Sequence, residues 1–168
     1  MPGISIYSIY LIMKKVFFLS ILFVAVYNGR GLAQDSARQA APVLSSYYTI
    51  QAALVNGDAH TAALGAGNLT KALQGASGQG LPAASREAIL KEAKPIAARE
   101  DLDVQRAHFA GLSTAMAALA KSVRLSADPV YEQYCPMKKA YWLSADKDIK
   151  NPYFGNAMLT CGKVVETF

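Results

Sequence analysis

Apolar residues between positions 43 and 123 recur at intervals of three and four, which is the spacing of one face of a helix. Four such stripes follow one another along this part of the chain. The stripes are Val43, Tyr47, Ile50 and Leu54; then Ala62, Ala66, Leu69 and Leu73; then Ile89, Ala93 and Ile96; and finally Phe109, Leu112, Met116, Leu119 and Val123. The pattern therefore predicts four amphipathic helices.

Residues typical of helix ends separate the first two stripes. Asn56-Gly57 predicts the end of the first helix, and Asp58 is a candidate N-cap for the second. The segment Gly75–Gly80 holds three glycines and predicts the loop that follows. The second helix is therefore expected to lie between Asp58 and this loop.

Further signals bound the third and fourth helices. The third is expected to begin near Ser85, and Pro95 should kink or end it because proline cannot donate the helical hydrogen bond. Asp101 and Asp103 are both candidate caps for the fourth helix. Four amphipathic helices with short joints indicate an antiparallel four-helix bundle over residues 43–126.

The character of the chain changes at Asp128-Pro129, where helical periodicity gives way to aromatic residues. Val130–Tyr134 and Ala140–Leu143 are predicted to form short strands. Turns are predicted at Asn151-Pro152 and at Gly155-Asn156. We expect a mainly α fold, in which an irregular, partly β C-terminal segment (residues 127–168) packs on the bundle.

The N-terminal segment has the pattern of a secretory signal. Lys14-Lys15 precedes the apolar run Val16–Tyr27, and Ala33 provides a small residue at the expected cleavage point before Gln34. This predicts a signal peptide over residues 1–33, followed by a flexible, alanine-rich leader over residues 34–42. The mature protein is then expected in the periplasm or otherwise outside the cytoplasm, with no stable membrane span.

The first twelve residues are apolar and precede a complete signal pattern, which indicates that translation starts at Met13. The alternative is one retained membrane anchor from Ile4 to Tyr27. Lys14 and Lys15 in the middle of that span disfavour it, at roughly 2.5–3.5 kcal/mol for each charge placed at the bilayer centre.

Charge and motif content exclude several functions. The net charge is +5, but Lys14, Lys15 and Arg30 account for three of the 17 basic residues. Without the first 33 residues the chain has 14 basic and 12 acidic residues, a net of +2, so a nucleic-acid partner is not expected. No phosphate loop, nucleophile elbow or Cys-x-x-Cys motif is present. We therefore do not expect an enzyme.

Both cysteines of the chain lie in the C-terminal segment, and each has a methionine nearby. Met137 follows Cys135 by two residues, and Met158 precedes Cys161 by three. Thiolate and thioether sulfurs are soft donors that select Cu(I). If the two segments fold together, these four residues would form a copper site. His108, at the border of the fourth apolar stripe, is a further candidate ligand, or else a packed side chain.

A disulfide between Cys135 and Cys161 is the alternative interpretation, because exported proteins usually pair their cysteines. Closing this loop would stabilise the fold by roughly 3.5 kcal/mol on the chain-entropy model. Met137 and Met158 would then be ordinary packing residues. The protein would in that case be a non-catalytic, disulfide-stabilised interaction domain.

Four ordered blocks in the last forty residues carry a resemblance to a known family. The blocks are Tyr134-Cys135-Pro136-Met137, Tyr141-Trp142-Leu143-Ser144, Ile149-Lys150-Asn151-Pro152-Tyr153-Phe154-Gly155 and Met158-Leu159-Thr160-Cys161-Gly162. From Val43 onward the chain resembles a bacterial domain family of unknown function. That family occurs as small exported proteins and as a domain appended to periplasmic adaptor subunits of heavy-metal (copper/silver) efflux pumps.

The resemblance implies metal handling in the periplasm. It favours Cys135, Met137, Met158 and Cys161 as ligands of a copper ion, Cu(I), with His108 as a fifth. Cys-Pro-Met also resembles a short heavy-metal motif, which continues with histidine where this chain has Lys138. The implied partners are the metal ion and an efflux-pump adaptor or another periplasmic metal carrier.

Overall fold

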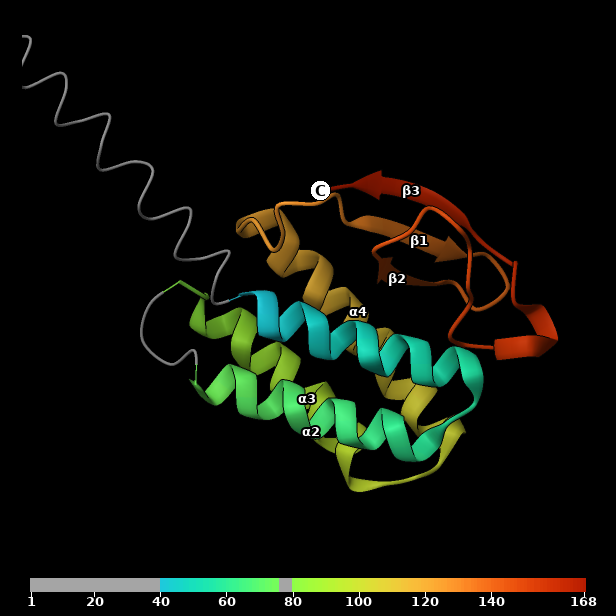
Figure 1. Ribbon diagram of the computed structural model, residues 1–168, viewed down its shortest axis with the longest axis horizontal. Coiled ribbons are helices and arrows are strands. Elements are labelled where there is room, and N and C mark those ends of the chain that lie inside the picture. Colours follow the sequence, from blue (N-terminus) through green and yellow to red (C-terminus); the bar gives the residue numbers. More distant parts are fainter. Residues whose placement is uncertain (1–39, 76–79) are drawn as a thin grey trace, which may run out of the picture. The chain divides into compact units, whose positions relative to one another are not determined.

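The structure is a computed structural model that describes residues 40–75 and 80–168 (Figure 1). The expected signal peptide, the start at Met13 and most of the Gly75–Gly80 loop lie outside these residues. The described chain contains helical residues 40–56, α2 (Ala59–Gly75), α3 (Ala83–Ala98), α4 (Leu102–Ser122), β1 (Tyr131–Cys135), β2 (Ala140–Ser144), the short 3-10 helix η1 (Gly155–Met158) and β3 (Lys163–Thr167). The predicted mainly α fold with a partly β C-terminal segment is confirmed.

The helices form because the predicted stripes are buried against one another. Of the residues in the four stripes, only Val123 is not buried, since it lies at the C-cap of α4. Asp58 accepts a hydrogen bond from the Thr61 backbone N–H at 2.9 Å, as its capping role predicts. Asp101, and not Asp103, caps α4 by accepting from the Asp103 and Val104 backbone N–H groups.

Two predicted boundaries differ from the structure. Residues 40–42, expected in the leader, are already helical, and Ala40 is completely buried. Pro95 does not end α3, which continues to Ala98. Proline removes one hydrogen bond, and burial of Ile96 stabilises the short remainder of the helix. Apolar packing therefore extends both helices beyond their sequence signals.

The C-terminal segment forms a three-stranded antiparallel sheet in the order β2-β1-β3, with β1 in the centre. Tyr131 lies opposite Ser144 in β2 and opposite Thr167 in β3. β3 is not predicted by the sequence pattern, because all five of its residues are exposed and show no alternation of polar and apolar positions. In Figure 1 the sheet lies over α4 and the N-terminal helix.

The hydroxyl of Tyr47 joins the helices to the sheet. Tyr47 is completely buried, and its ring stacks on Phe109 of α4 at 5.2 Å between centroids. Its oxygen accepts the Leu143 backbone N–H of β2 at 2.9 Å and lies 2.7 Å from the Ser113 hydroxyl of α4. One side chain of the N-terminal helix therefore satisfies polar groups on two other elements.

Arg106 of α4 holds the loop before η1 in place. Its Nε donates to the Pro152 carbonyl and its Nη2 to the Leu54 carbonyl, both at 3.0 Å. Gly155 lies so close that a Cβ atom would be 2.9 Å from the Val55 carbonyl oxygen, and its φ of +52° also favours glycine. The loop is thus attached to the end of the N-terminal helix.

Within residues 40–75 and 80–168, no helix combines the length and the apolar character that crossing a bilayer requires.

We expect Tyr47→Phe to lower the free energy of unfolding by about 1–3 kcal/mol, because the buried Leu143 N–H loses its acceptor. Urea denaturation would measure the change. Tyr131→Phe is the matched control, since Tyr131 is only half-buried, and it should change stability by no more than about 0.5 kcal/mol. Equal effects of the two substitutions would contradict the linking role of Tyr47.

Candidate functional site

The sheet brings the two cysteines together. Cys135 is the last residue of β1, and Cys161 lies two residues before β3. Because β3 pairs with β1 and Lys163 lies opposite Tyr134, the chain returns beside Cys135. The two sulfur atoms are 3.7 Å apart although 26 residues separate them in the sequence. The structure therefore contains a dithiol that depends on strand pairing.

Both cysteines are free thiols. The disulfide left open as an alternative by the sequence is not formed, because its sulfur atoms would lie about 2.05 Å apart. Cys135 is completely buried, whereas Cys161 is partly exposed. The dithiol thus has a buried sulfur and a sulfur that solvent can reach.

Asn151 orders the loop that carries Cys161. It is completely buried, and its side-chain amide donates to the Cys161 carbonyl at 2.8 Å. Its side-chain oxygen accepts the Tyr153 backbone N–H at 2.9 Å, and its own backbone N–H donates to the Leu159 carbonyl. The sequence indicates only a turn at Asn151, because a single polar residue before proline carries no signal of these partners.

Gly162 lets the same loop pack closely on the sheet. A Cβ atom at this position would lie 2.8 Å from the Cη2 atom of Trp142, which is less than any ordinary contact. Trp142 is completely buried and is the only tryptophan of the chain. The indole ring therefore lies next to the residue that follows Cys161, where it can report on the thiols.

The two thiols differ in their readiness to ionise. Burial opposes ionisation of Cys135, but hydrogen bonds outweigh it and lower the pKa of this thiol. The donors are the Lys138 backbone N–H, the Asn151 amide, the Cys161 thiol and the Met137 backbone N–H. Burial and the neighbouring Cys135 raise the pKa of Cys161. Cys135 is therefore the thiol that ionises first.

Lys138 contacts the thiol through its backbone. The Lys138 backbone N–H donates to the Cys135 sulfur at 3.4 Å. The turn between β1 and β2 creates this contact, and Lys139 adopts a left-handed φ of +55° within it. A backbone donor of this kind cannot be read from residue type.

The two methionines lie beside the dithiol and neither belongs to the core. The Met158 carbonyl accepts the Cys161 backbone N–H at 3.1 Å. Met137 follows Cys135 in the turn, and 65% of its surface is exposed, while Met158 is partly exposed. Packing in the hydrophobic core does not explain either side chain.

His108 is engaged elsewhere. Its Nδ1 lies 2.9 Å from Glu92 Oε2 of α3. In the part of the chain that the structure describes, no three His, Cys, Asp or Glu side chains are grouped so as to hold a metal ion. The structure therefore does not bring His108 into a shared cluster with Cys135 and Cys161.

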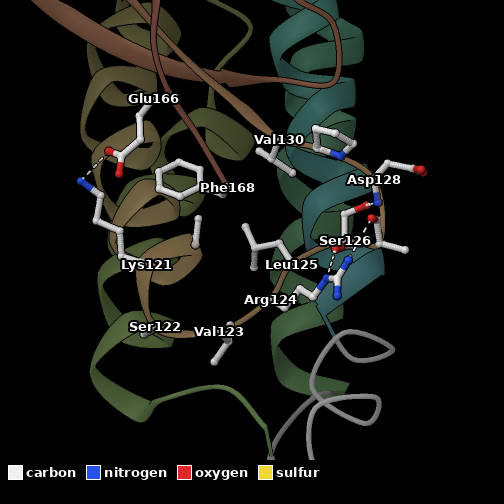
Figure 2. A pocket seen from close by; sticks show the side chains of 13 residues that line it. Lys121, Ser122, Val123, Arg124, Leu125, Ser126, Asp128, Val130, Glu166 and Phe168 are labelled. Carbon is white, nitrogen blue, oxygen red and sulfur yellow. Dashed lines mark hydrogen bonds and ion pairs between the residues drawn. The ribbon is translucent and has the colours of Figure 1, made fainter.

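A groove of about 690 Å³ lies at the other end of the sheet, where the chain enters β1 (Figure 2). Its two basic side chains are already paired. Lys121 forms an ion pair with Glu166 at 3.0 Å, and Arg124 donates to the Ser126 and Ala127 carbonyls. We do not assign a ligand to this groove, because it is remote from the dithiol and has no convergent free polar group.

Comparison with known proteins identifies one family. The family model described as "Protein of unknown function (DUF3347)" matches residues 43–128, just over half of the chain. The match covers the helices and ends before β1, so it does not include the four C-terminal blocks that carried the resemblance. No curated protein and no solved structure matches the chain significantly.

Two ionisations are expected in a pH titration of thiolate absorbance at 240 nm. The pKa of Cys135 should lie below the ordinary value of a cysteine thiol, and the pKa of Cys161 should lie above it. The low pKa of Cys135 stabilises the fold above the pKa of the unfolded thiol, and this stabilisation is lost as the pH falls through the folded value. Cys161→Ser should leave only the first ionisation; a remaining thiol that ionises above the ordinary pKa would contradict the assignment.

Mild oxidation with diamide should convert the dithiol into an intramolecular disulfide, because the sulfur atoms are already in contact. Mass spectrometry of the intact monomer should show the loss of two hydrogen atoms. Disulfide-linked dimers as the main product would show that Cys135 and Cys161 are not neighbours in solution.

Proposed function

The chain belongs to the DUF3347 family, and we propose that it is a soft-metal carrier that binds Cu(I) outside the cytoplasm through Cys135 and Cys161. The observation that carries this proposal is the distance of 3.7 Å between two free thiols. Two thiolates bound to one tetrahedral ion at about 2.3 Å, the usual zinc–sulfur distance, lie about 3.8 Å apart. The sulfur pair therefore fits one metal ion without rearrangement of the sheet.

The chemistry of the donor set supports a soft ion. Thiolate is a soft ligand, and Cys135 is the thiol that the surrounding N–H groups make easier to ionise. Met137 and Met158 would complete the ligand set with thioether sulfur. Their exposure supports this role over that of core packing, since Met137 would otherwise present an apolar side chain to solvent without a partner.

The arrangement suits ligand exchange. Cys135 would anchor the ion from the buried side, while Cys161 and Met137 lie where a partner can reach them. The expected signal peptide would send the protein to the periplasm. There it would exchange Cu(I) with an efflux-pump adaptor or another metal carrier, in keeping with the resemblance of its C-terminal blocks.

The second candidate is a disulfide-stabilised interaction domain, which the same 3.7 Å contact favours if the thiols are oxidised where the protein works. In that case the loop of Cys161 would be fixed covalently to β1. The dithiol would then serve stability alone, and Cu(I) would bind no more tightly than to an unrelated protein.

Titration of the reduced protein with Cu(I) under anaerobic conditions, against a chromogenic chelator, tests the proposal. We expect one equivalent to be withdrawn from the chelator and the fluorescence of Trp142 to fall in parallel, because its indole ring lies beside the loop of Cys161. The affinity should decrease as the pH falls, since protons compete for the thiolates. Failure to compete would exclude the Cu(I) function, and tighter binding of Zn(II) would replace Cu(I) as its ion.

Variants separate the roles of the four sulfur residues. Cys135→Ser or Cys161→Ser should abolish competition with the chelator, whereas Met137→Leu with Met158→Leu should weaken it about tenfold or more. Met116→Leu is the matched control, because Met116 is completely buried in the core. Circular dichroism would confirm that each variant folds. Full affinity in the double Met variant would remove both thioethers from the site.

A further inference from the structure

Exposed lysines lie near both cysteines in the sequence, and acidic residues are absent from the same stretches. Residues 133–145 and 149–165 carry Cys135 and Cys161, and neither stretch contains Asp or Glu. Between them they contain four lysines, all of which are exposed. These residues, Lys138, Lys139, Lys150 and Lys163, are called the lysine rim below.

Strand pairing and the connecting loops place the lysine rim at the thiols. Lys138 and Lys139 belong to the turn that begins directly after Cys135, and the Lys138 N–H contacts its sulfur. Lys163 lies opposite Tyr134, one residue before Cys135 in β1. Lys150 precedes Asn151, whose amide donates to the Cys161 carbonyl. All four therefore come from segments that contact the dithiol.

The rim is available to a partner. Among the residues that the structure describes, the ion pairs are His60–Glu100, His108–Glu92 and Lys121–Glu166, so no rim lysine is neutralised by one. Met137, the most exposed large apolar side chain among the described residues, lies between Cys135 and Lys138 in the sequence. An exposed apolar side chain bordered by polar residues has the arrangement of an interface centre within a polar rim.

The acidic residues that border the two stretches in the sequence lie just outside them. Glu166 is paired with Lys121 of α4, and Glu132 is buried beside it in the neighbouring strand position. Asp146 and Asp148 are exposed in the loop after β2, where their carbonyls face the Gln133 amide. The segments around the thiols thus keep a single sign of charge.

We propose that the lysine rim docks an acidic metal-carrying protein and guides Cu(I) transfer to the dithiol, an inference that rests on the proposed function. In the transfer, bonds from Cu(I) to the partner's sulfur donors break as bonds to Cys161 and Cys135 form. No electron is exchanged, and the protons of the thiols pass to solvent. Opposite charge around the donors increases the rate of encounter and aligns the two sites.

Stopped-flow transfer from two synthetic peptides tests this surface. Both contain the same Met-x-x-Met donor pair loaded with Cu(I); one is flanked by Asp and the other by Lys. We expect the acidic peptide to deliver Cu(I) about tenfold faster at low ionic strength, and the difference to shrink near 0.15 M salt. Quenching of Trp142 fluorescence would follow the transfer.

Substitution of lysine by glutamate tests which lysines cause the preference for the acidic peptide. We expect the basic peptide to become the faster donor in the double variant Lys138→Glu, Lys139→Glu. In the double variant Lys150→Glu, Lys163→Glu, the preference for the acidic peptide should decrease. Lys91→Glu with Lys94→Glu is the matched control, because it makes the same change in net charge on the exposed face of α3, which packs against α2 and α4. This control should retain the wild-type preference.

The outcomes separate the docking surface from the metal site. Equal rates with both peptides, in a protein that competes with the chelator for Cu(I), would overturn the lysine rim and leave the Cu(I) function intact. An equal loss of preference in the α3 control would also overturn the rim, because net charge alone would then explain the rates. Absence of Cu(I) binding would overturn the proposed function and the docking surface together.

Discussion

The buried hydroxyl of Tyr47 is the constraint on which the arrangement of this protein depends. A strand laid on a helical core must find acceptors for peptide N–H groups that face away from water, because an unpaired buried donor is costly. Tyr47 accepts the Leu143 N–H and contacts Ser113, so the N-terminal helix, α4 and β2 can assemble in one relative position. Since β2 pairs with β1 and β1 with β3, this one contact also determines where the two thiols lie.

The helices could be predicted from the sequence, because each buries one stripe and exposes the rest. The spacing of Val43, Tyr47 and Ile50, by four and then three residues, carries that information directly. Strand β3 could not be predicted in this way, since exposure on both faces leaves no periodicity in Lys163–Thr167. Pro95 was expected to kink or end α3; it does not end the helix, because the burial of Ile96 offsets one missing hydrogen bond. The local sequence therefore predicts the helices, whose buried stripes supply much of the core. The presence of β3 and the end of α3 depend on tertiary contacts.

The candidate site was accessible to prediction only in part. Residue type identified Cys135 and Cys161, and the structure brings them into contact. Residue type also suggested His108, but Glu92 of α3 binds that ring. The groups that tune the thiols, the Lys138 N–H and the Asn151 amide, come from a turn and a loop whose shape depends on the whole sheet. The family match covers the helices alone, so the chemistry of the C-terminal segment stands on its own geometry.

The position of Cys161 just before the outer strand has a consequence for folding kinetics. The helices join residues that are close in sequence, and such contacts form fast, whereas β1 and β3 pair across more than twenty-five residues and must close a loop first. We expect an early species in which the helices are packed and the thiols are still apart. For that interval each thiol can react with foreign disulfides. The speed at which β3 docks therefore determines how many molecules reach the native state with their dithiol intact.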